Sequence, residues 1–143
     1  MMTKIRLATL ALIVLTAAGC SKGGPTKYPV RGIVLVNGVP TGMVVVQFSN
    51  TDPAVTGNAR CPTALTKADG TFTMLTTKQD DGVPPGEYIV TFMHLDRPDP
   101  IPNDLLRGAY SDPAKSTFRV KVEDKAIDLP PYELTVDAKG KKN

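Results

Sequence analysis

Short apolar runs that alternate with polar residues, each ended by a turn-forming residue, constrain the fold of this chain most. Thirteen prolines and twelve glycines are spread through its 143 residues, and a proline inside a helix costs about 3 kcal/mol. In segment 117–123, Phe118, Val120 and Val122 alternate with charged residues. This period of two is typical of a strand with one buried face. The sequence therefore predicts an almost entirely β structure.

Seven short strands separated by turn signals predict a seven-stranded antiparallel β-sandwich. Asn37-Gly38 predicts a type I′ hairpin turn, because both residues accept positive φ angles, and Ala68-Asp69-Gly70 predicts a second hairpin. Pro130-Pro131 interrupt the last run, which predicts a bulge or a change of sheet on an edge strand. The expected strands are residues 30–36, 43–48, 63–67, 71–75, 87–93, 117–123 and the interrupted run 127–136.

The alternation also predicts which side chains form the core and where the loops lie. Two longer loops separate the strands, residues 50–62 and Asp96 to Lys115, and in the second Asn103 is expected to cap one helical turn. Functional residues concentrate on loops of this kind. The side chains expected to be buried are Phe48, Phe72, Val90, Phe92, Val120 and Leu134.

The first twenty residues have the organisation of an export signal. Lys4 and Arg6 precede an apolar run, residues 7–15, that is short for a membrane span, and small residues then lead to Cys20. This pattern resembles a bacterial lipoprotein signal. The resemblance implies cleavage before Cys20, a diacylglycerol on its thiol and a fatty acyl chain such as palmitate on its amino group. An ordinary secretory signal cleaved near Ala18 is the alternative.

The expected organisation is a signal peptide at 1–19, a lipidated Cys20 with a flexible tether to residue 27, a sandwich at 28–137 and a basic tail at 138–143. Loss of Lys4 and Arg6 with the signal leaves 15 basic against 14 acidic residues, so no nucleic-acid partner is expected. Cys61 is then the remaining thiol, which excludes an intramolecular disulfide. We expect it to be small and buried.

Several segments carry a resemblance to a known family. Segments 30–34, 42–48, 66–72 and 84–90 resemble the carboxypeptidase-regulatory-like, transthyretin-type modules. The similarity is greatest to the short lipoproteins of planctomycete-type bacteria, in which Tyr110-Ser111-Asp112-Pro113 also recurs. The resemblance implies a prealbumin-like sandwich, and most members of the family have no assigned activity. Its motifs serve backbone geometry and do not indicate a chemistry.

Catalysis has few candidate residues, because His94 is the only histidine. Intradiol dioxygenases bind iron with two tyrosines and two histidines, and transthyretin-type ring hydrolases need several histidines, so neither pattern is present. His94, Asp96 and Ser111 or Ser116 could supply a Ser-His-Asp set, but no nucleophile-elbow motif accompanies the serines. The protein is therefore expected not to be an enzyme.

Metal binding has two candidate residue sets. Met93-His94 with Met43 or Met74 would suit Cu(I), although Met74 shares a face with Phe72 and is expected in the core. Asp69 with Asp80-Asp81 would offer oxygen ligands to Ca²⁺, although turn formation accounts for each aspartate. No metal or other cofactor is therefore predicted.

Glycan binding usually needs an exposed aromatic platform, for which Tyr28, Tyr110 and Tyr132 are the candidates. We expect a lipid-anchored, non-catalytic interaction or structural module in the periplasm or on the cell surface. Its partners would be membrane lipid, through acylated Cys20, and an envelope protein or glycan. The alternative is a small-ligand or glycan binder that uses the Asp96 to Lys115 loop.

Overall fold

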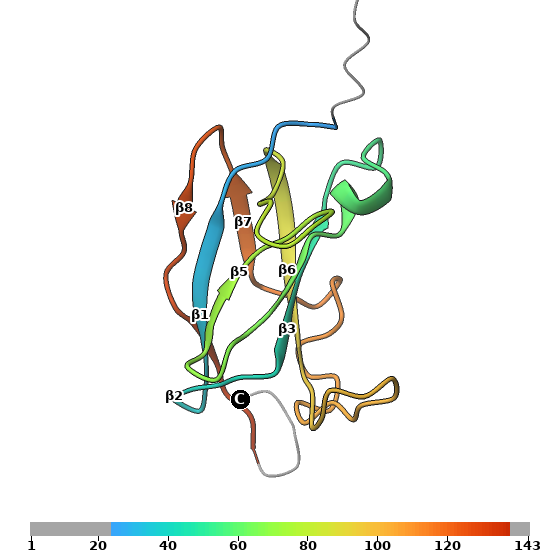
Figure 1. Ribbon diagram of the computed structural model, residues 1–143. Helices are drawn as coiled ribbons and strands as arrows, with labels where there is room; N and C mark the ends of the chain where they lie inside the picture. Colours follow the sequence, from blue (N-terminus) through green and yellow to red (C-terminus); the bar gives the residue numbers. More distant parts are fainter. Residues whose placement is uncertain (1–23, 138–143) are drawn as a thin grey trace, which may run out of the picture.

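The computed structural model describes residues 24–137. The predicted signal peptide, the predicted lipidation site Cys20 and the expected basic tail lie outside the described residues. Within them the chain forms an all-β sandwich of two sheets, which confirms the expected fold class (Figure 1). The structure has nine described strands where seven were expected: β1 Val30–Val36, β2 Val39–Pro40, β3 Val44–Asn50, β4 Thr63–Leu65, β5 Thr71–Thr73, β6 Gly86–His94, β7 Arg119–Val122, β8 Ile127–Asp128 and β9 Tyr132–Leu134, with one 3₁₀ helix, η1 Gly57–Arg60.

One sheet has the strand order β4-β3-β6-β7 and is antiparallel throughout. Its centre is the long pairing of β3 with β6, which runs from Val44 opposite His94 to Asn50 opposite Tyr88. Alternate residues of both strands are buried, as the period of two predicts. β3 begins one residue later than expected, because Met43 has a positive φ of 61°.

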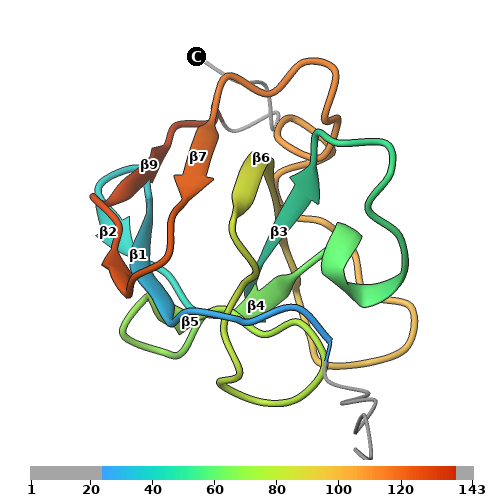
Figure 2. The same ribbon diagram turned by 90° about the horizontal axis from the view of Figure 1, so that it is seen from above.

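The other sheet is mixed, and here the expectation of a purely antiparallel sandwich is wrong. β2 and β5 pair with β1 in antiparallel fashion, whereas β8 and β9 run parallel to β1. The cause is the connection after β7, which crosses to the opposite sheet at the end where β1 begins, so that Ile127 lies opposite Val30 (Figure 2). A strand that enters beside the start of β1 must run in the same direction.

Pro130-Pro131 produce a bulge, one of the two predicted outcomes. Arg31 pairs with Asp128 and Val34 with Tyr132, so β1 advances by three residues while the facing chain advances by four. Both prolines fall in this unpaired stretch, where no backbone N–H is needed. The chain remains beside β1 on both sides of the bulge.

The predicted turns form, but the second joins different sheets. Asn37 and Gly38 have φ angles of 50° and 81°, as a type I′ turn requires. At the Asp69 turn, Lys67 and Thr71 share a backbone hydrogen bond of 2.8 Å, and Thr63 and Leu75 pair again further along, although β4 belongs to one sheet and β5 to the other. This turn therefore closes one edge of the sandwich.

The core lies between the sheets and contains most of the expected side chains. Phe48, Phe72, Val90, Phe92 and Leu134 are buried as predicted. Val120 is only partly buried, because β7 pairs with β6 alone and lies at the edge of its sheet. Four rings form a cluster at the core: Phe92, Tyr110, Phe118 and Tyr132, with centroids 5.1 to 6.4 Å apart.

Candidate functional site

The chain enters the sandwich at one end and forms its longest loop at the other. Tyr28 pairs with Val83, three residues before β6 begins at Gly86. β6 then runs for nine residues to His94, where the Asp96 to Lys115 loop starts. At about 3.3 Å per residue, this strand separates the two ends by about 30 Å. Figure 1 shows the entering chain at the top and the loop at the bottom.

The entry end is fixed by a partly buried ion pair. Lys27 Nζ lies 2.6 Å from Asp81 Oδ2, and 7% of the Asp81 side chain is exposed. The carboxylate also accepts backbone hydrogen bonds from Thr76, Thr77 and Lys78. The described part of the predicted tether, residues 24–27, thus ends in a side chain that binds the sandwich.

The base of the long loop is organised by Asp104. Its Oδ1 accepts hydrogen bonds from the backbone N–H groups of His94 and Leu106, and its Oδ2 accepts one from Gly108. Leu106 is buried beneath this network. The predicted helical turn after Asn103 does not form, because residues 105–111 make successive turns and Arg107 has a positive φ of 50°.

Tyr110 attaches the remainder of the loop to the core. Its hydroxyl donates a hydrogen bond to Thr135 O and accepts one from Thr135 N, both 2.9 Å long. Tyr110 and Tyr132 are both buried. Two of the three tyrosines considered for an exposed sugar-stacking platform are therefore unavailable, whereas Tyr28 is partly exposed.

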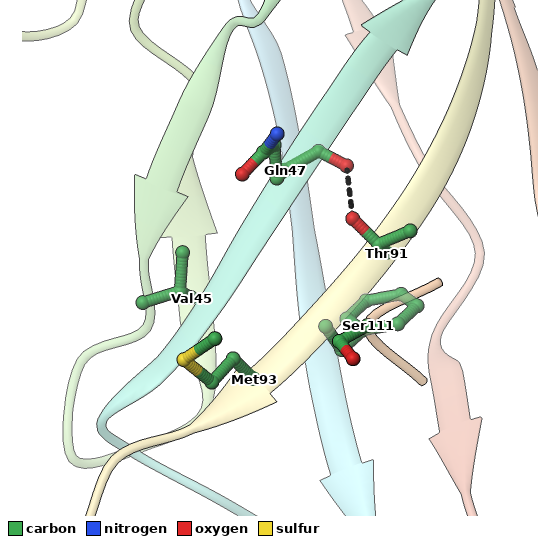
Figure 3. Close-up of a pocket in the computed structure, with 6 residues that line it drawn as sticks. Val45, Gln47, Thr91, Met93 and Ser111 are labelled. Carbon is green, nitrogen blue, oxygen red and sulfur yellow. Dashed lines mark hydrogen bonds between the residues drawn. The ribbon is translucent and has the colours of Figure 1, made fainter. Parts of the chain in front are cut away.

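A small hollow lies on the outer face of the β4-β3-β6-β7 sheet, beside this loop (Figure 3). It is lined by Val45, Gln47, Thr91, Met93 and Ser111, and Thr91 Oγ1 donates a 3.5 Å hydrogen bond to Gln47 O across it. Its volume is about 70 Å³, whereas pockets for small organic ligands measure about 300 to 1,000 Å³. The hollow can accept a few waters or one short side chain.

The aspartate and the serines considered for a Ser-His-Asp set form hydrogen bonds that hold the long loop. Asp96 accepts hydrogen bonds from Asn103 N and Nδ2, Ser111 Oγ donates to Gly108 O, and Ser116 Oγ donates to Val90 O. Burial lowers the pKa of His94, and the nearby Asp104 opposes that shift. His94 ends β6, whereas Ser116 lies beside Val90 in the middle of that strand, and the bonds of these groups hold the loop.

Of the residues considered for metal binding, Met43 lies beside Leu95 and so next to His94, whereas the others lie apart. Met74 is fully buried in the core, whereas Met93 lies on the outer face of β6. Asp69 accepts two hydrogen bonds from Thr71, which lower its pKa, and Asp81 holds the entry end. In residues 24–137 no three His, Cys, Asp or Glu side chains gather closely enough to bind a metal ion.

Cys61 is exposed, so the expectation of a buried thiol is wrong. It follows η1 on the loop between β3 and β4, while the next residue, Pro62, is buried and its carbonyl accepts the Phe48 N–H. Only one of these neighbours can point inward. The thiol therefore lies at the surface, on the entry end.

Comparisons with known proteins identify no family. No protein-family model matches this chain, and no curated protein matches it. Among solved structures, the chain is similar to the dioxygenase domain of a dioxygenase and carbohydrate-binding protein fusion from Streptomyces sp. SirexAA-E. The TM-score is 0.43 and the sequence identity is 21%, and the match covers 82% of this chain and 84% of that domain. It is also similar to a 9R-lipoxygenase from Cyanothece PCC8801, with a TM-score of 0.39, 12% identity and coverage of 76% of this chain but 16% of the lipoxygenase. Similarities at this level indicate no activity for this chain.

No helix in the described residues is both long enough and apolar enough to span a membrane.

Proposed function

We propose that this protein is a lipoprotein anchored through an acylated Cys20, whose sandwich is a non-catalytic interaction module of the cell envelope, facing the periplasm or the cell surface. One observation supports this proposal above the others: the chain enters at one end, beside Val83, and the Asp96 to Lys115 loop lies at the other. A domain tethered at its entry end presents the opposite loop away from the lipid surface. The resemblance to lipoprotein modules adds the expectation of an anchor.

The anchor is tested by metabolic labelling with an alkyne fatty acid. We expect the wild-type protein to be labelled and the Cys20→Ser variant to remain unlabelled, because the acylated thiol is lost. Cys61→Ser is the matched control and should label like the wild type, since this thiol lies within the sandwich domain. Equal labelling of Cys20→Ser would contradict the proposal.

The orientation is tested by energy transfer to acceptor dyes in the membrane. A donor dye on Cys61, which is exposed on the loop between β3 and β4, should transfer more strongly than one on an Ile101→Cys, Cys61→Ser variant, whose thiol lies in the Asp96 to Lys115 loop. Pro62, next to Cys61, bonds to Phe48 in β3, whereas position 101 lies beyond His94, where β6 ends away from the entering chain (Figure 1). Equal transfer from both positions would contradict a domain that stands on its entry end.

Small-ligand or glycan binding is a second candidate function. A hollow of about 460 Å³ on the outer face of the β1 sheet favours it, with Arg31, Lys67 and Asp128 at its margin. This volume falls within the range of ligand pockets, unlike the hollow beside the long loop. Titration with acidic and neutral oligosaccharides, followed by NMR, should shift the Thr73 amide if the hollow binds them. An unchanged spectrum would exclude these ligands.

A further inference from the structure

The apex of the Asp96 to Lys115 loop exposes a single isoleucine. Ile101 has 82% of its surface exposed, more than any other large apolar residue in the described part of the chain. Figure 1 shows this loop projecting beyond the sandwich at the end opposite the entering chain. Single exposed apolar residues are common on protein surfaces. Ile101 differs because the loop around it restricts its conformation.

The neck of the apex is closed by three hydrogen bonds between two residues. Asp96 N donates to Asn103 O at 3.1 Å, Asn103 N donates to Asp96 Oδ1 at 2.9 Å, and Asn103 Nδ2 donates to Asp96 Oδ2 at 2.8 Å. We call the segment Asp96–Asn103 the apex loop. Its two ends are thereby held side by side, next to the bridge between Leu95 and Asp104 that follows β6.

Arg97 links several residues of the apex loop, although half of its side chain is exposed. Its guanidinium forms ion pairs with Asp96 and Asp99 and donates a 3.4 Å hydrogen bond to Ile101 O, while Ile101 N donates to Asp99 Oδ1 at 3.2 Å. Both backbone groups of Ile101 are therefore held from inside the loop. Pro98, Pro100 and Pro102 further restrict the chain, because proline fixes its own φ and limits the preceding residue.

We propose that the apex loop is a preorganised protein-binding loop, and that Ile101 inserts into an apolar pocket of an envelope protein. This proposal rests on the proposed function, which locates the partner in the cell envelope. A loop already held in one conformation loses less entropy on binding, and binding energy in protein interfaces concentrates in a few side chains that fill pockets.

The charge of the loop indicates the chemistry of the partner's surface. Residues 96–107 contain three aspartates and two arginines, an excess of one negative charge. A complementary pocket therefore has a basic rim. The same charge disfavours a lipid surface, since membrane-binding segments combine several apolar side chains with basic residues that meet anionic headgroups.

The test uses a photo-crosslinking amino acid at position 101 of the lipidated full chain, in the cells that produce it. Val39, 62% exposed at the start of β2 and at the same end of the sandwich, is the matched control position. We expect a discrete protein adduct from position 101 and none from position 39. A synthetic cyclised peptide of residues 96–103 should suppress the adduct, whereas its Ile101→Ala form should need about tenfold more.

Arg97→Met should weaken the adduct several-fold without unfolding the sandwich, because the Arg97 side chain is 51% exposed. Any of four results would overturn the proposal: equal adducts from both positions, a covalent dimer of this chain, a lipid adduct, or an adduct that ignores both the peptide and Arg97→Met. A fatty-acid-labelled protein without an adduct would contradict protein binding by the apex loop, but not the lipid anchor. An adduct that persists in an unlabelled protein would contradict only the anchor.

Discussion

Asp81 is a carboxylate that the fold removes from water and then surrounds with donors. Burial alone would raise its pKa, but the Lys27 ammonium and the backbone N–H groups of Thr76, Thr77 and Lys78 outweigh burial and lower the pKa to about 2. The folded state therefore favours the ionised form more than the unfolded chain does. The stabilisation is present above pH 4 and is lost as pH falls from about 4 to about 2.

Asp81→Asn should therefore remove about 2 kcal/mol of stability at neutral pH, because a shift of this size corresponds to about 1.4 kcal/mol per pKa unit. The stability of the variant should also depend less on pH below about 4. Urea denaturation at several pH values measures both effects. Asp80→Asn removes the same charge at an exposed neighbouring residue and is the matched control, which should cost much less stability at neutral pH.

Phe92→Ala should cost about 3 to 5 kcal/mol, the usual loss for a buried aromatic residue. Phe92 is 2% exposed and contacts the rings of Tyr110, Phe118 and Tyr132. Met93→Ala, the next residue on β6, is the control: its side chain is 38% exposed and its loss should cost less than about 1 kcal/mol. Chemical denaturation compares the two. Similar costs would mean that the buried face of β6 has been misassigned.

At the scale of elements, Asp104 fastens the base of the long loop to the end of β6, through the backbone N–H groups of His94, Leu106 and Gly108. Asp104→Ala should therefore speed amide hydrogen exchange at Leu106 and Gly108 by about tenfold or more. Exchange at Val46 and Phe48, within β3, should remain slow. Asp112→Ala, in the same loop, is the control, since its carboxylate accepts a backbone hydrogen bond only from Ala114. A uniform increase in exchange would instead indicate global destabilisation.

At the scale of the whole molecule, stability should not depend on metal ions. One histidine, one exposed thiol and carboxylates that hold loops cannot supply the four to eight ligands of a tight site. Melting temperatures measured with EDTA, Ca²⁺, Zn²⁺ and Cu(I) should agree, because a ligand selective for the native state would raise them. A saturable increase with one metal, lost in His94→Ala or Asp69→Ala, would contradict this prediction.

The sequence alone determined what depends on neighbouring residues. Alternation along β3 and β6 predicted their buried faces, and Asn37-Gly38 predicted a turn whose positive φ angles the structure contains. Both features follow from a repeat of two residues and from local backbone sterics. Pro130-Pro131 likewise predicted an interruption, because proline donates no hydrogen bond.

Only the tertiary structure decided which distant segments meet. The parallel pairing of β8 with β1, the burial of Tyr110 against Thr135 and the ion pair of Lys27 with Asp81 join residues far apart in the chain. Neither a period nor a turn motif encodes such contacts, since they depend on how the two sheets close around one core. The same packing buried Pro62 and left Cys61 at the surface, and it brought the apex loop to the end opposite the chain's entry.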